Sequence, residues 1–237
     1  MEKVIALVED DDTIRQNIAE LLEENRFVVQ AYASRAEAEN AFSLKLPDMA
    51  LLDIGLNEER EGGFDLCRFI RKRSETIPVI FLTSYSTNSD EISGLRLGAD
   101  DYISKEEPLE KVIVRINSLF RRTEALSNNL LKDTTPNADY LLHSKELTID
   151  MLHYEVTWKG YSLKFPLTQL WILHSLAKRP GQIKSKESLM EAANITHSGS
   201  STIVVHINAI RNAFKSVDQS FDKIENKRGL GYLWKPQ

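Results

Sequence analysis

The feature of this 237-residue chain that most constrains its fold is the alternation, in the first half, of short apolar runs with segments of helical periodicity. The runs are rich in Val, Ile and Leu and are bounded by polar residues, which is typical of buried parallel strands. Five such units predict an α/β doubly wound, five-stranded parallel sheet. The expected strands are Val4–Val8, Phe27–Val29, Met49–Ile54, Val79–Ser84 and Tyr102–Ile103, and the expected helices are 13–24, one capped by Ser34 that ends near Pro47, 64–73, 88–98 and one from about Pro108.

Carboxylates follow two of these strands. Glu9 and Asp10 end the first strand, and Asp53 lies near the end of the third. Ligands of open α/β sheets bind at the carboxyl ends of the strands, so we expect these side chains to converge there. Three carboxylates repel one another unless a cation separates them, and Mg²⁺ suits an all-oxygen site. For Asp11 and Asp12 we favour the plainer interpretation, that they cap the next helix.

Composition and charge predict two domains. The chain is 42% hydrophobic and 27% charged, which is ordinary for a globular protein, and it is long enough for two domains. Its net charge of −5 divides into −8 for residues 1–122, −2 for 123–139 and +5 for 140–237. The middle segment is typical of a helix extension that runs into a linker. The basic part suits phosphate backbones, although such a surface is also compatible with ordinary solvation.

Nothing in the sequence indicates a membrane protein. The apolar runs are far shorter than the roughly 20 residues of a transmembrane helix, and the chain begins directly with a strand rather than a signal peptide. We therefore expect a cytoplasmic location without membrane insertion. The single cysteine, Cys67, lies among apolar residues at helical spacing and is expected to pack in the core.

The second half combines short strands with three helices and a final hairpin. Thr168 and Ser185 are candidate caps of the first two helices, and Pro180-Gly181 separates them. The predicted elements are strands Leu147–Ile149, Glu155–Trp158 and Ser162–Phe165, a helix bearing Leu170, Leu173, Leu176 and Ala177, a helix through Leu189, a helix over Ser201–Phe214, and a glycine-containing hairpin over Ile224–Trp234.

The polar residues at the strand ends follow an ordered pattern. Glu9 and Asp10 are followed by Asp53, then by Thr83, then by Lys105. In this order and distribution the chain resembles the receiver domain of two-component response regulators over residues 1–122. The resemblance implies a flavodoxin-like fold and transfer of a phosphoryl group.

The resemblance also implies a role for each matching residue. Asp53 is expected to accept the phosphoryl group, and Lys105 to neutralise its charge. Thr83 is expected to donate its hydroxyl to a phosphoryl oxygen, after which Tyr102 rotates as the switch. The expected Mg²⁺ ligands are Glu9, Asp10, Asp53 and the backbone carbonyl of Gly55.

In winged-helix members of this group, the surface of the fourth helix, fifth strand and fifth helix pairs two receivers. Relative to the family, Glu91 and Lys111 have exchanged their signs, which preserves self-pairing and penalises pairing with relatives. The alternative is that these are solvated helix-face charges of little energetic weight. The candidate dimer residues are Glu91, Asp100, Asp101, Lys111, Arg115 and Arg122.

The chain departs from the receiver pattern in two places. Asn57 stands where the family has proline, in a somewhat longer loop that carries extra acids. These acids could slow the phosphodonor or alter metal affinity, or the loop could simply be solvated. Glu106 follows Lys105 where the family has a proline after a cis peptide bond, which leaves the path of this segment open.

Residues 140–237 resemble the winged-helix effector domain of the OmpR/PhoB family. The resemblance rests on spaced matches and, most specifically, on the closing Arg228-Gly-Leu-Gly-Tyr232. The spaced matches are Ala177, Pro180, Gly181, Ser185, Glu187, Leu189, Thr202, Val205, His206, Ile207 and Arg211.

In that family the third helix enters the major groove of DNA and the hairpin reaches the minor groove. The expected DNA contacts are Ser201, Thr202, Asn208, Arg211 and Arg228, and the expected buried face is Ile203, Ile207, Ile210 and Phe214. His206 could contact a phosphate or be a hydrogen-bonded structural residue. Ala209, Asn212 and Ala213 stand where relatives carry Arg or Lys, which predicts weak binding per protomer and reliance on repeated half-sites.

The two resemblances together imply a phosphorylation-activated transcriptional regulator. Its expected partners are a sensor histidine kinase, double-stranded DNA, a second copy of the chain and RNA polymerase. We expect no enzymatic activity other than the receiver's catalysis of its own phosphorylation and dephosphorylation.

Other functions are less compatible with the sequence. An aspartate-nucleophile phosphatase typically has a second Asp where this chain has Gly55, and a dinucleotide enzyme needs Gly-x-Gly-x-x-Gly after the first strand. An atypical regulator that acts without phosphorylation, or through protein contacts, remains an alternative.

Overall fold

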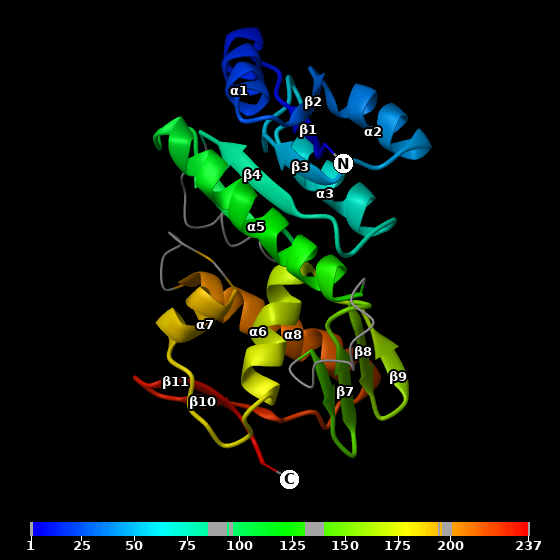
Figure 1. The fold of residues 1–237 in the computed structure, drawn as a ribbon, viewed down its shortest axis with the longest axis vertical. Coiled ribbons are helices and arrows are strands. Elements are labelled where there is room, and N and C mark those ends of the chain that lie inside the picture. Colours follow the sequence, from blue (N-terminus) through cyan, green and yellow to red (C-terminus); the bar gives the residue numbers. More distant parts are fainter. Residues whose placement is uncertain are drawn as a thin grey trace. The chain divides into compact units, whose positions relative to one another are not determined.

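A computed structural model describes residues 2–84, 94, 97–130, 140–193, 195 and 201–236, without the side chains of residues 83, 109, 122–130 and 201 (Figure 1). The chain forms two compact units, Met1–Asn117 and Ser118–Gln237. The division falls inside helix α5, Leu109–Leu130, which continues into the predicted linker. The domain limits 1–122, 123–139 and 140–237 therefore remain predictions.

The first unit contains the predicted doubly wound sheet. All neighbouring strands are parallel, and their order is β2-β1-β3-β4-β5. The strands are β1 Val4–Val8, β2 Val28–Tyr32, β3 Met49–Leu52, β4 Val79–Thr83 and β5 Asp101–Ser104.

Two helices of this unit begin where the sequence provides a capping side chain. Helix α1, Asp12–Glu24, is capped by Asp11, which accepts a hydrogen bond from the Ile14 N–H (2.9 Å). Helix α2, Arg35–Leu44, is capped by Ser34, and α3 spans Gly62–Arg71. These two caps confirm the predictions for Asp11 and Ser34. The helix predicted over 88–98 lies outside the described residues.

Residues of the strands alternate between two cores, as expected for a sheet covered on both faces. Ala6, Ala50 and Phe81 pack in one cluster with residues of α2 and α3, including Cys67, which is buried as predicted. The intervening residues, such as Leu7 and Leu51, are equally buried and belong to the opposite face. Strands β1 and β3 are therefore packed on both sides up to their last residues, Val8 and Leu52.

The second unit contains a four-stranded antiparallel sheet, three helices and a two-stranded hairpin, which is the predicted winged-helix architecture. Its first strand, β6, was not predicted from the sequence. The elements are β6 Leu141–His143, β7 Leu147–Asp150, β8 Glu155–Trp158, β9 Tyr161–Leu163, α6 Leu167–Ala177, α7 Lys186–Ala192, α8 Ser201–Val217, β10 Ile224–Lys227 and β11 Gly231–Trp234.

One of the two predicted caps in this unit is wrong. Ser185 caps α7 as predicted, by accepting a hydrogen bond from the Ser188 N–H (3.1 Å). Helix α6, however, begins at Leu167 after Pro166, and Thr168 is buried inside its first turn. Proline fixes a φ that is compatible with entry into a helix, so the helix starts before the threonine.

Helix α8 is held by its apolar face and by its last turn. Ile203, Ile207, Ile210 and Phe214 are all buried, as predicted. Phe214 stacks on Phe221 with ring centroids 4.2 Å apart. Beyond the helix, Asp218 accepts hydrogen bonds from the Trp158 Nε1–H (2.9 Å) and the Lys159 ammonium (2.8 Å) of the β8 region.

The final hairpin is joined along β11 to the segment before α7. Lys184 and Tyr232 exchange both backbone hydrogen bonds (2.7 and 2.9 Å), and the Gly181 N–H donates to the Trp234 carbonyl (2.8 Å). A Cβ at Gly231 would lie 2.0 Å from the Lys184 carbonyl oxygen, and φ at this position is +129°. Glycine is therefore required for this close approach.

Within the described part of the chain, no helix combines the length and apolar character needed to span a membrane.

Candidate functional sites

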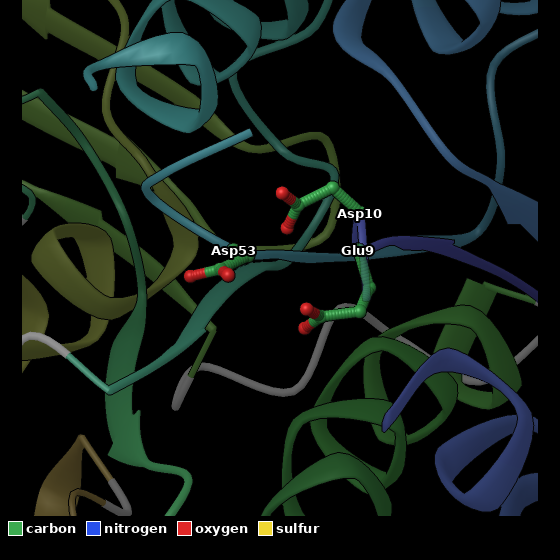
Figure 2. Close-up of side chains that lie close together, drawn as sticks. All are labelled: Glu9, Asp10 and Asp53. Carbon is green, nitrogen blue, oxygen red and sulfur yellow. The ribbon is translucent and has the colours of Figure 1, made fainter. Parts of the chain in front are cut away.

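The acidic residues of the first unit meet at the strand ends, as the sequence predicts (Figure 2). Strands β1 and β3 are direct neighbours in parallel register, so Glu9 and Asp10 lie beside Asp53. Ligand atoms of all three carboxylates lie within 4.8 Å of one another. Glu9 is 1% exposed and Asp53 8%, whereas Asp10 is half-buried.

Lys105 extends from the end of β5 to the same place. Its ammonium lies 2.5 Å from Oε2 of Glu9 and 2.7 Å from Oδ2 of Asp53. Burial acts to lower the pKa of Lys105, but hydrogen bonds to Asp53 and Glu9 raise it above its ordinary value. A positively charged ammonium therefore lies directly against the Asp53 carboxylate.

Burial dominates the electrostatics of Glu9. It raises the pKa of Glu9 to about 7, an effect that Lys105 partly offsets and the neighbouring Asp53 reinforces. Additional positive charge nearby would lower this pKa and stabilise the ionised form of Glu9. The donor set, three carboxylates on two adjacent strand ends, fits a hard cation with oxygen ligands.

The strand end that carries Asp53 is fixed by its surroundings. The Ile54 N–H donates to Oδ1 of Asp53 (2.7 Å), and the Gly63 N–H donates to the Ile54 carbonyl (2.9 Å). A Cβ at Gly63 would lie 1.9 Å from the Asp53 carbonyl oxygen, so a larger residue there would displace the strand end.

Two residues that hold the acids were missed in the sequence. Arg15 of α1 donates to the backbone carbonyls of Glu9 (2.7 Å) and Asp10 (3.2 Å). The backbone N–H of Asn57 donates to Oδ2 of Asp10 (2.8 Å). Arg15 is only 6 and 5 positions from Glu9 and Asp10, so its proximity in sequence is a signal that could have indicated the contact. Asn57 is 47 positions from Asp10, and the sequence offers no such signal for it.

The loop after Asp53 is closed by a backbone bridge, while its residues 57–61 are exposed to solvent, as the solvated alternative predicts. Leu56 and Glu59 exchange both backbone hydrogen bonds (3.0 and 2.9 Å), and Leu56 is buried. Glu59 also pairs with Arg35 of α2, at 2.5 Å from its Nε. The extra residues therefore form a small structure of their own beside the acidic site.

The chain after Lys105 turns without the proline of the family. The Lys105–Glu106 bond is trans, like every peptide bond in the described ranges. Ser104 closes the turn, because its carbonyl accepts from the Glu107 N–H (3.0 Å) and its hydroxyl from the Glu106 N–H (3.2 Å).

The remaining predicted receiver residues are Thr83, Tyr102 and Gly55. Thr83 ends β4, but its side chain lies outside the described part. Tyr102 is half-buried and packs against the core cluster of α2 and α3, and Gly55 is half-buried beside Asp53.

Several candidate dimer residues are engaged within their own chain. Arg115 pairs with Asp101, with both side chains buried, and Asp100 forms a buried pair with Arg71 (3.0 Å). Lys111 is partly exposed and lies 3.4 Å from Glu107. Glu91 and the side chain of Arg122 lie outside the described residues.

The candidate DNA contacts also differ in accessibility. Asn208 and Arg228 are exposed, whereas Thr202 is 1% exposed. The guanidinium of Arg211 donates to the Ile224 carbonyl of β10 (2.9 Å) and lies 5.7 Å from the Tyr232 ring centroid. The side chain of Ser201 lies outside the described part of the structure.

A groove of about 480 Å³ separates α8 from the hairpin. Val204 of α8 lines one side, and Arg228 with Asn226 lines the other. The cap residue Ser185 and Lys186, the first residue of α7, also line the groove.

His206 does not line this groove. It is fully buried, and neither ring nitrogen has a hydrogen-bond partner among the described residues. Burial lowers the pKa of His206 to about 4. A fully buried ring does not reach a DNA phosphate, and the alternative of a hydrogen-bonded structural histidine finds no partner within the described ranges.

Comparison with known families matches both halves of the chain. The response regulator receiver domain family matches residues 5–117, and the family described as "Transcriptional regulatory protein, C terminal" matches residues 160–234. Both resemblances drawn from the sequence are thus confirmed.

Individual relatives extend over the whole chain. The transcriptional regulatory protein CseB of Streptomyces avermitilis is 32% identical over 98% of this chain and 97% of its own length. The phosphate regulon transcriptional regulatory protein PhoB of Rhizobium meliloti is 29% identical over 96% of each. Among solved structures, a mutant form of RitR covers 99% of this chain and 100% of its own at 18% identity with a TM-score of 0.74, which supports the fold. The protein is a member of the OmpR/PhoB family of response regulators, with a receiver domain and a winged-helix DNA-binding domain.

Proposed function

We propose that this protein is a transcription regulator activated when Asp53 accepts a phosphoryl group from a sensor histidine kinase. The observation that carries the proposal is the meeting of Asp53, the Lys105 ammonium and the acids Glu9 and Asp10 at one edge of the sheet. This arrangement combines a nucleophile with the positive charge that an arriving phosphoryl group requires.

In the proposed reaction, a carboxylate oxygen of Asp53 attacks phosphorus in line with the leaving group. The bond from phosphorus to the kinase histidine breaks, and its electron pair returns to the imidazole. Lys105 neutralises charge on the phosphoryl oxygens, and the Thr83 hydroxyl donates to one of them. Mg²⁺, held by Glu9, Asp10, Asp53 and the carbonyl of Gly55, would supply further positive charge when bound.

Hydrolysis of the phosphorylated Asp53 is proposed to return the receiver to its starting state, so that it catalyses both its phosphorylation and its dephosphorylation. Between these steps, movement of Thr83 is proposed to let Tyr102 rotate. The changed surface would pair two receivers through Lys111 and its partners.

The second domain is proposed to bind promoter DNA as this dimer and to contact RNA polymerase. The exposed Asn208 and Arg228 are our candidates for DNA contact, with α8 in the major groove and the β10–β11 hairpin in the minor groove. Acting on chromosomal DNA would place the protein in the cytoplasm.

The direct test is incubation of the full chain with Mg²⁺ and a small phosphodonor, followed by intact-mass measurement. We expect a mass gain of one phosphoryl group in the wild-type chain and none in Asp53→Ala. Asp65→Ala is a matched control, because Asp65 is an exposed carboxylate of α3 that pairs only at the surface. Equal mass gain in Asp53→Ala would overturn the proposal.

A regulator that acts without phosphorylation, or through protein contacts, is the second candidate. It is favoured by the small number of basic side chains on α8, where Thr202 is buried and Arg211 is hydrogen-bonded to β10. Selection of bound genomic fragments with and without phosphodonor separates the two. Enrichment only with phosphodonor supports the first candidate, whereas equal enrichment without it supports the second.

A further inference from the structure

The contact between the hairpin loop and Asp10 gives one acid of the site a support that the family pattern does not provide. Asn57 stands where relatives have proline, and proline has no N–H to donate. In this chain the Asn57 N–H donates to Oδ2 of Asp10 over 2.8 Å. Hydrogen bonds from N–H groups to carboxylates are among the stronger ones in proteins.

The loop conformation is built to present this N–H. Asn57 has φ of +55°, a left-handed conformation that asparagine and glycine adopt most readily. The two backbone hydrogen bonds between Leu56 and Glu59 close the turn around it.

Two further contacts fix the loop against the connection between β2 and α2. The side-chain amide of Asn57 donates to the Ala33 carbonyl (3.1 Å). Glu59 pairs with Arg35 just beyond it. The loop is thus bound to the β2–α2 connection through Asn57 and to α2 through Glu59, and it contacts Asp10 from this fixed position.

We infer that Asn57 is a positioning residue that holds the carboxylate of Asp10 in the orientation required for binding a divalent cation. The hydrogen bond occupies Oδ2 and leaves the second oxygen available as a ligand. Asp10 is half-buried and has side-chain rotations to lose on binding, so fixing it beforehand lowers the cost of binding. Partners that orient metal ligands typically change metal affinity by about 10-fold to 100-fold when removed.

The inference rests on the proposed function, which supplies the cation. The first test is an NMR titration of the full chain with MgCl₂ alone. For Asn57→Pro, which removes the N–H and cannot hold φ of +55°, we expect affinity to fall about tenfold. Asn57→Gly keeps both the N–H and the left-handed turn, and we expect its affinity to stay near the wild-type value. Glu58→Gln is the control for loss of charge in the same loop.

The outcomes are distinct. Loss of affinity in Asn57→Pro with retention in Asn57→Gly supports the inference. Equal affinity in all variants overturns it, and so does an equal loss in Asn57→Pro and Asn57→Gly, which would assign the effect to the side-chain amide. A wild-type chain that binds no Mg²⁺ and gains no phosphoryl group would overturn the proposed function as well.

The second test does not depend on metal or on a proline variant. Hydrogen exchange of the Asn57 amide is compared between the wild-type chain and Asp10→Ala without Mg²⁺. Loss of a hydrogen bond to a charged group accelerates exchange by about tenfold or more where local opening limits it. Unchanged exchange at Asn57, with other amides of the sheet unaffected, would show that the contact is not made in solution and would overturn the inference.

Discussion

Arg115 donates to both carboxylate oxygens of Asp101 over 3.1 Å each, and both side chains are buried in the same chain. Burial raises the pKa of Asp101, and the guanidinium of Arg115 only partly offsets this effect. The pair thus has a structural role within the receiver, whatever its part in a dimer.

Replacing Arg115 with Met should destabilise the receiver by about 3 kcal/mol, because it leaves a buried carboxylate without its partner. Because the receiver contains no tryptophan, tryptophan fluorescence does not report its unfolding. Far-UV circular dichroism in urea is used instead to measure the change in stability. Lys111→Ala is the matched control on the same helix, and its exposed pair should contribute less than about 1 kcal/mol. Equal stability of the two variants would contradict the structural role.

Reversing one charge on the proposed dimer surface should weaken pairing without affecting folding. We expect Lys111→Glu to reduce dimerisation of the phosphorylated chain, because the partly exposed ammonium is available to a second copy. Sedimentation of the phosphorylated protein measures the effect. Sedimentation identical to that of the wild type would remove Lys111 from the dimer surface.

Loss of the ammonium at the acidic site should slow phosphorylation strongly. Lys105→Met keeps the length and apolar stem of the side chain but leaves Asp53 and Glu9 without compensation. By analogy with the removal of one charge-stabilising group from an active site, we expect a rate about 100-fold lower. The time course of mass gain with a small phosphodonor measures it, and a rate within about twofold of wild type would contradict the role of Lys105.

Arg228 and Arg211 should differ in their effect on DNA binding. Arg228 is exposed beside the groove, so Arg228→Ala should weaken binding and reduce the slope of log affinity against log salt by about 1. Arg211→Met should instead lower the stability of the hairpin, because its guanidinium is hydrogen-bonded to Ile224. Fluorescence anisotropy of labelled DNA across salt concentrations measures the slopes, and tryptophan fluorescence in urea, to which Trp234 of β11 contributes, measures the stability. A reduced slope in Arg211→Met without loss of stability, together with an unchanged slope in Arg228→Ala, would exchange the two assignments.

The buried His206 should make the winged-helix domain less stable in acid. Its pKa is about 4 in the folded protein and about 6.5 when unfolded, so the unfolded chain binds the proton first as pH falls. The contribution of neutral His206 is complete above about pH 6.5 and is lost progressively down to about pH 4, amounting to about 3 kcal/mol.

The variant His206→Leu should lack this part of the pH dependence. Tryptophan fluorescence in urea isolates the effect, because Trp158, Trp171 and Trp234 all lie in the second unit. The difference between wild type and variant should grow as pH falls from 6.5 to about 4. A constant difference over this range would show that His206 is not buried in its neutral form.

Features encoded by neighbouring residues were predicted well from the sequence. Ser34 and Ser185 cap their helices because a hydroxyl reaches an N–H only three positions away. The strands that end beside Glu9, Asp10 and Asp53 could be predicted because each is a short, continuous apolar run without helical periodicity. Thr168 failed as a cap because Pro166 competes for the helix start within two residues.

Features that depend on distant contacts could not be predicted. The engagement of Asp101 by Arg115 and of Asp10 by Asn57 requires knowledge of which segments meet in space. The three-residue strand β6 has too short a pattern to be recognised, and it forms because β7 offers a partner. The burial of Thr202 and His206 depends on the packing of α8, which the polar character of their side chains obscures.

The pairing of β11 with Lys184 has a consequence for self-association. A hairpin of two four-residue strands is marginal in water, and an open strand edge is a template for pairing with another chain. The segment from Gly181 to Lys184 occupies one edge of the hairpin, and Arg211 takes the Ile224 carbonyl at the other. The hairpin therefore offers few backbone groups for edge-to-edge aggregation, a property that would matter most if, as proposed, two copies are brought together on DNA.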